Sequence, residues 1–164
     1  MGDMAKAARY IPEGYHTITP HLEVKQGAAR YIDFLKKAFG AREVSRMEGP
    51  GGKLIHAEVV IGDSRVMLAD SFPEFGSPPI AEGHWPVALH LYVQDADKTF
   101  AQAQAAGCEV TMPLADQFWG DRYGLVKDPF GFGWSIATHK EELTPEEMNQ
   151  RMQEAFRQHG GQGA

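Results

Sequence analysis

The chain contains one pattern of secondary structure twice, and this repetition limits the possible folds more than any other feature. Residues 15–70 show the order strand, helix, strand, strand, strand, and residues 87–139 show the same order again. The two copies also share residues: H-L-E-V-K-Q at 21–26 corresponds to H-L-Y-V-Q-D at 90–95. The offset between matching segments stays at about 66 to 69 residues, as a duplicated module requires. The sequence therefore predicts an α+β fold of tandem βαβββ modules.

Local signals predict each element of the two modules. Alternating apolar and polar residues predict strands, and apolar residues at helical spacing predict one helix in each module. Gly40 suits the end of the first helix, and Asp95 suits the N-cap of the second. The strands expected in the first module are 17–25, 41–47, 54–61 and 65–70, around a helix at 26–40; those expected in the second are 87–94, 108–114, 122–128 and 133–138, around a helix at 95–107.

Three segments fall outside the two modules. Residues 1–14 are polar and irregular and are expected to be a flexible N-terminus, while residues 71–86 are rich in Pro and Gly and are expected to be a linker. Residues 140–164 are expected to form a C-terminal helix and tail, because T-P-E-E at 144–147 is a capping box. This helix is expected to pack on the body of the protein or across the contact of a homodimer.

Charge and cysteine content limit the possible partners and the compartment. The chain has a net charge of −6, which argues against nucleic acid as a partner, because phosphate binding needs clustered Lys and Arg. Its apolar runs are all shorter than the roughly 20 residues of a membrane helix, so no membrane partner is expected. The single cysteine, Cys108, excludes an internal disulfide and is interpreted as a small buried residue. We therefore expect a cytoplasmic protein.

The residues of both modules resemble a known superfamily. The first module contains T-P-H-L-E-V, A-A-R-Y-I-D-F-L-K-K-A-F-G-A and H-A-E-V-V-I-G-D-S-R-V-M-L-A-D, and the second contains L-H-L-Y-V-Q-D and Q-F-W-G-D-R-Y-G-L-V-K-D-P-F-G-F-G-W-S-I-A-T-H. Over about residues 16–143 the chain resembles the vicinal oxygen chelate superfamily, which includes glyoxalase I, extradiol dioxygenases and bleomycin-resistance proteins. Within it the chain is similar to the PhnB-like branch. The resemblance implies one domain in which the strands of the two modules form a U-shaped cavity.

The resemblance also implies where a metal ion would bind. In metal-dependent members, ligands come from the first and last strands of each module, and these positions correspond here to Thr19, Met67, Ala88 and Ser135. None of the four is a good ligand for a divalent ion, and a catalytic site usually needs about three His, Asp or Glu ligands. We therefore expect no metal ion and no other cofactor.

Strand parity identifies further residues of the cavity, because side chains two apart share a face of a strand. If Thr19 and Ala88 point into the cavity, then His21, His90 and Tyr92 do so too. Three interpretations of the two histidines stay open: metal ligands, acid–base or hydrogen-bonding groups for a ligand, and structural residues. The pair His56 and Glu58 lies on an internal strand and is interpreted as a polar pair of the sheet rather than a ligand pair.

The stretch 115–134 contains the last group of candidate residues. In one interpretation, Phe118 and Trp119 form an aromatic wall at the mouth of the cavity, and Arg122 binds an anionic or aromatic ligand. In the other, Arg122 pairs with Asp116 or Asp121, and the aromatic residues belong to the core. The sequence D-P-F-G at 128–131 is interpreted only as a turn.

These observations lead to three hypotheses about function. The first is metal-independent binding of a small aromatic or polar molecule in the cavity between the modules. Its ligand-binding residues would be His21, His90, Tyr92, Trp119, Arg122 and Ser135. The alternative is a metalloenzyme of the same superfamily, a lyase, isomerase or dioxygenase, with its metal ion at an atypical site. A scaffold without a ligand is a third possibility, and these alternatives stay open at this point.

Overall fold

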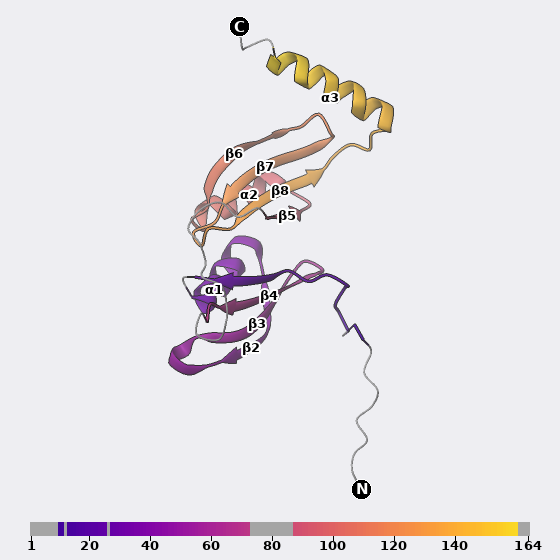
Figure 1. The fold of residues 1–164 in the computed structure, drawn as a ribbon. Helices are drawn as coiled ribbons and strands as arrows, with labels where there is room; N and C mark the ends of the chain where they lie inside the picture. Colours follow the sequence, from indigo (N-terminus) through magenta and orange to yellow (C-terminus); the bar gives the residue numbers. More distant parts are fainter. Residues whose placement is uncertain (1–9, 12, 26, 73–86, 161–164) are drawn as a thin grey trace. The chain divides into compact units, whose positions relative to one another are not determined.

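The computed structural model describes residues 10–11, 13–25, 27–72 and 87–160, and it divides the chain into two compact units, Met1–Ala81 and Glu82–Ala164. Figure 1 shows the order of the elements in each unit. Each unit contains one four-stranded sheet with a helix inserted after its first strand. The predicted α+β fold of tandem βαβββ modules is confirmed. The end of the first unit lies within the segment 71–86 that was expected to be a linker.

The first unit has the strand order β1-β4-β3-β2, in which β1 is parallel to β4 and the other neighbours are antiparallel. Its helix α1 contacts β1, β3 and β4. The helix buries an apolar side that contains Tyr31, Ile32 and Leu35, and the sheet contributes the buried residues Leu54 and Leu68. The elements are β1 (His21–Val24), α1 (Ala28–Phe39), β2 (Arg42–Glu48), the 3₁₀ turn η1 (Pro50–Gly52), β3 (Leu54–Ile61) and β4 (Ser64–Asp70).

The second unit repeats this arrangement with the strand order β5-β8-β7-β6, in which β5 is parallel to β8. Helix α2 contacts β6, β7 and β8. Phe100 and Ala103 of α2 are buried, as are Val126 and Ile136 of the sheet. The elements are β5 (Ala88–Tyr92), α2 (Ala96–Ala105), β6 (Glu109–Asp116), β7 (Asp121–Lys127), β8 (Gly133–His139) and the tail helix α3 (Pro145–Gly160).

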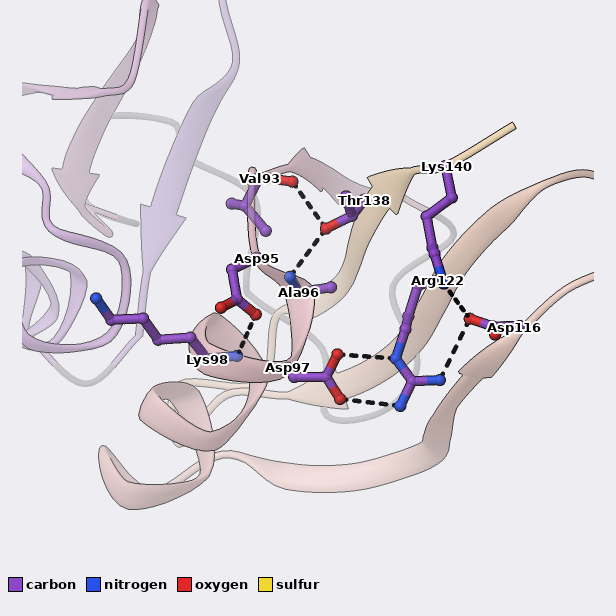
Figure 2. Close-up of polar contacts among 9 residues, drawn as sticks. All are labelled: Val93, Asp95, Ala96, Asp97, Lys98, Asp116, Arg122, Thr138 and Lys140. Atoms are coloured by element: carbon purple, nitrogen blue, oxygen red, sulfur yellow. Dashed lines mark hydrogen bonds and ion pairs between the residues drawn. The ribbon is translucent and has the colours of Figure 1, made fainter. Parts of the chain in front are cut away.

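In each unit, the end of the last strand binds the beginning of the helix. Asp70 at the end of β4 accepts a hydrogen bond from the backbone N–H of Ala28, at 2.8 Å, and another from Leu54, at 2.6 Å. In the second unit, Thr138 of β8 accepts from the N–H of Ala96 and donates to the carbonyl of Val93, both at 2.8 Å (Figure 2). These side chains satisfy amide groups that an α-helix leaves without partners in its first turn.

The predicted helix caps are confirmed. The Asp95 side chain accepts from the N–H of Lys98 at 3.0 Å. Thr144 and Glu147 form the reciprocal pair of bonds that defines a capping box, and α3 begins at Pro145. The α3 side chain of Arg151 forms an ion pair with Glu141, at 2.7 Å.

Most element boundaries differ from the prediction by one or two residues, and the start of the first strand differs most. The first strand begins at His21 rather than at residue 17, because Pro20 has no N–H for a ladder and contributes only its carbonyl, which accepts from Met67. The turn at 49–52 contains η1. Cys108 is buried as predicted, and burial raises the pKa of its thiol to about 12. No helix in the described part of the chain is long and apolar enough to cross a lipid bilayer.

Candidate functional site

The two faces of the second sheet differ in what covers them. On β7, the side that contains Arg122, Gly124 and Val126 faces α2: a Cβ at Gly124 would lie 2.7 Å from the ring of Phe100 in α2. Side chains alternate along a strand, so Asp121, Tyr123 and Leu125 occupy the opposite face. This opposite face, which α2 does not cover, is the candidate site.

Cross-strand register brings three of the predicted residues, His90, Tyr92 and Ser135, together on this face. His90 of β5 lies opposite Ser135 of β8, and its Nδ1 shares a hydrogen bond of 2.6 Å with the Ser135 hydroxyl. Tyr92 of β5 and Tyr123 of β7 both pair with Ala137 between them. The parity that was predicted for β5 and β8 is confirmed by these contacts.

A row of rings runs across this face. The centroids of His90 and Tyr92 are 4.4 Å apart, those of His90 and Tyr123 are 5.9 Å apart with nearly parallel planes, and those of Tyr123 and Trp119 are 5.2 Å apart. Phe118 extends the row beyond Trp119. Tyr92 is 62% exposed. We call His90, Tyr92, Trp119, Tyr123 and Ser135 the aromatic face.

A buried carboxylate lies at one end of the aromatic face. Asp121 is only 4% exposed, and its Oδ1 is 2.7 Å from Nδ1 of His139. Its Oδ2 accepts a long hydrogen bond, 3.4 Å, from the hydroxyl of Tyr92. The Nε2 of His139 lies 3.1 Å from Glu142. Burial, followed by the charge of Asp121 and the hydrogen bond to it, raises the pKa of Tyr92, so this phenol is neutral at ordinary pH.

Arg122 does not join the aromatic face. Its guanidinium binds Asp97 of α2 through two bonds, 2.8 Å from Nε and 2.9 Å from Nη2, and also contacts Asp116 at 3.3 Å (Figure 2). Asp116 also pairs with Lys140, at 3.6 Å. The pairing with Asp116 corresponds to the structural interpretation of Arg122, and the contact with Asp97 was not foreseen.

His21 lies in the first unit, on the corresponding face of its sheet. Its ring centroid is 6.0 Å from that of His56. His56 contacts Glu58 at 3.1 Å, and Glu58 pairs with Arg65 at 3.2 Å. A hydrogen bond from Tyr15 is the largest of several contacts that lower the pKa of Glu58. His56 and Glu58 thus form a polar pair of the sheet, as interpreted from the sequence.

Of the positions implied for a metal ion, Met67, Ala88 and Ser135 lie in β4, β5 and β8, whereas Thr19 precedes the first residue of β1. Met67 pairs with His21, Ser135 pairs with His90, and Ala88 pairs with Gly133. Among the described residues, no group of three or more His, Cys, Asp or Glu side chains is arranged to hold a metal ion. The D-P-F-G segment is a turn, with the N–H of Gly131 bonded to the carbonyl of Asp128 at 3.0 Å.

Sequence reasoning missed three members of this region: Tyr123, Asp121 and His139. Parity along 121–127 could have grouped Tyr123 with Asp121. The pairing of Asp121 with His139 depends on the register between β7 and β8, which no local pattern specifies.

Comparison with known proteins agrees with this fold. The model of a family described as the Glyoxalase/Bleomycin resistance protein/Dioxygenase superfamily matches residues 24–136. The chain belongs to this superfamily. A superfamily member of this kind is expected to have two βαβββ modules, and the sheets described above agree with that expectation.

Individual relatives are similar over most of the chain. An uncharacterized protein of Mycobacterium bovis is 45% identical over 139 residues, which are 82% of this chain and 91% of that protein. The crystal structure of TioX from Micromonospora sp. ML1 is 30% identical with a TM-score of 0.58, over 74% of this chain and 98% of TioX. A PhnB protein from Bacillus cereus shares the fold, with 20% identity and a TM-score of 0.62, over 75% of this chain and 99% of that one.

Proposed function

We propose that this superfamily member binds a small aromatic or polar molecule on its aromatic face, and that it does so without a metal ion. The observation that carries the proposal is the row of rings from Trp119 to Tyr92. Large aromatic side chains at a partly exposed surface offer apolar area and stacking contacts, and binding sites combine such area with a few polar groups. Here the polar groups are His90 and Ser135.

His90 is suited to orient a bound molecule. Its Nδ1 is engaged with Ser135. If Ser135 donates that bond, Nε2 carries the proton and donates to a ligand; if Nδ1 carries the proton, Nε2 accepts from a ligand. In both tautomers the ring therefore offers one directional contact beside the stacked rings.

The proposal is tested with N-phenyl-1-naphthylamine, an uncharged aromatic probe whose fluorescence rises on binding. The protein is first treated with EDTA and dialysed, and its metal content is measured by mass spectrometry. Binding of the probe to the metal-free protein is the expected result. Tyr92→Ala and Trp119→Ala should each weaken it by roughly five- to a hundredfold, because losing the contacts of one stacked ring costs about 1–3 kcal/mol of binding free energy.

Phe156→Ala is the matched control, because Phe156 is 70% exposed on α3 and lies outside the aromatic face. Equal losses in Tyr92→Ala and Phe156→Ala would indicate non-specific adsorption and refute the site. One divalent ion per chain, removed by EDTA together with probe binding, would favour the metalloenzyme alternative. His21→Ala tests whether the first unit also binds the probe.

A further inference from the structure

The residues around Asp121 affect which ligands the aromatic face accepts. This inference rests on the function proposed above. Asp121 is buried, yet one of its oxygens reaches the hydroxyl of Tyr92 on the aromatic face and the other reaches His139. A buried carboxylate needs a cationic or hydrogen-bonding partner, because burial without one is unfavourable. The proton of His139 therefore affects a charge that lies directly beside the ligand-binding rings.

Asp121, His139 and Glu142 form a group of ionisable side chains at this end of the aromatic face. His139 contacts Asp121 from β7 and Glu142 from the segment after β8, and Tyr92 from β5 is neutral. Lys140 and Arg122 are engaged with Asp116, and Arg122 also with Asp97. With His139 protonated, the group of Asp121, His139 and Glu142 has a net charge of −1 (−1 +1 −1). With His139 neutral, the net charge is −2.

His139 holds its proton more tightly than an ordinary histidine does. Its pKa is raised from the ordinary value of 6.5, first by the hydrogen bond to Asp121 and second by the one to Glu142. The imidazolium is therefore present below pH 6.5 and persists somewhat above it. As the pH rises through the raised pKa, the proton is lost, and a neutral imidazole can no longer donate to both carboxylates.

We propose that the Asp121–His139 pair makes ligand binding on the aromatic face depend on charge and pH, so that a planar aromatic molecule with an acidic group binds best while His139 is protonated. A proton on His139 offsets the charge of Asp121, so the net charge of the group is −1 rather than −2 and the repulsion of the acidic group is weaker. Loss of that proton strengthens the repulsion again. An uncharged aromatic molecule does not experience this change, because it has no charge for the carboxylates to repel.

Two probes of nearly the same shape separate these cases: N-phenyl-1-naphthylamine, which is uncharged, and 8-anilino-1-naphthalenesulfonate, which carries a sulfonate. Their dissociation constants are measured between pH 6 and 9. The ratio of the sulfonate's affinity to that of the uncharged probe should fall roughly two- to fivefold across this range, as one partly screened charge predicts. In His139→Gln the ratio should fall much less steeply with pH, because this variant lacks the proton of His139. A flat ratio in the wild-type protein would overturn the proposal, as would an unaltered slope in His139→Gln.

Glu142→Gln provides a second test, because it removes one carboxylate but retains the contact between His139 and Asp121. The midpoint of the pH dependence should move to lower pH, since Glu142 is one cause of the raised pKa. An unchanged midpoint would refute the inference that His139 binds Asp121 and Glu142 at the same time.

Nuclear magnetic resonance separates this proposal from the proposed function. The ring signals of Tyr92 should titrate with the midpoint of His139, and Asp121→Asn should abolish this coupling. If neither probe binds but the signals titrate together, the proposed function fails and the coupling stands. If the uncharged probe binds and the Tyr92 signals do not follow His139, the coupling is refuted and the proposed function stands.

Discussion

Replacing Asp70 with alanine should destabilise the first unit strongly. The carboxylate is 7% exposed and accepts from two backbone amides, those of Ala28 and Leu54. Both residues are completely buried, so neither amide gains water as a substitute partner when the carboxylate is removed. Each buried donor left without an acceptor costs about 1–3 kcal/mol, which gives about 4 kcal/mol for the pair. This is a large part of the roughly 5–15 kcal/mol that stabilises an ordinary domain.

Urea unfolding followed by two signals measures this loss. Far-UV circular dichroism reports on the secondary structure of both units, whereas all three tryptophans follow residue 81 and report on the second unit alone. Asp70→Ala should lower the unfolding midpoint seen by circular dichroism, and Asp70→Asn should lower it by about half as much, since one acceptor oxygen remains. Asp63→Ala, at an exposed turn, is the control. A loss below about 1 kcal/mol for Asp70→Ala would refute the reasoning.

Three further predictions concern other parts of the structure. Arg122→Ala should lower the urea midpoint only slightly, because the contact with Asp97 is exposed to solvent, and it should leave binding of N-phenyl-1-naphthylamine unchanged in a fluorescence titration. Gly120→Ala should lower the free energy of unfolding, measured in urea, by roughly 2–4 kcal/mol, because φ at Gly120 is +96° and the added Cβ would lie 2.7 Å from a backbone oxygen. Gly40→Ala should lower it by about 1 kcal/mol, because the space around the added Cβ is open. Cys108 should react with iodoacetamide very slowly at pH 8 and rapidly in urea, because burial raises its pKa to about 12.

The sequence was sufficient for the fold because its local signals agree with one another. Apolar alternation specifies the strands, and the capping residues Asp95 and Thr144 specify where helices begin. The repeated order of elements then leaves few arrangements for each sheet. The role of Asp70 could not be predicted, since its partner Ala28 is 42 residues away and the pairing depends on β4 lying beside β1.

The candidate site was predictable only in part. Parity along β5 placed His90 and Tyr92 on one face, and the register confirmed Ser135 as their neighbour. The direction of Arg122 depends on where β7 begins after the turn at 117–120, and a shift of one residue exchanges the two faces. The turn residue Trp119 joins the aromatic face through its contact with Tyr123, which the sequence does not specify.

The parallel pairing of the first strand with the last has a consequence for how the chain is made. Among the described strands of its sheet, β1 is bonded to β4 alone, and His21 pairs with Met67, 46 positions later (67 − 21). During synthesis, β1 therefore has no neighbouring strand to pair with until β4 has left the ribosome. The local hairpin of β2 and β3 can form earlier. A nascent chain that stops before Asp70 also lacks the side chain that caps α1. Translation must finish the whole module before its first strand can be stably folded, and the second module repeats this requirement with β5 and β8.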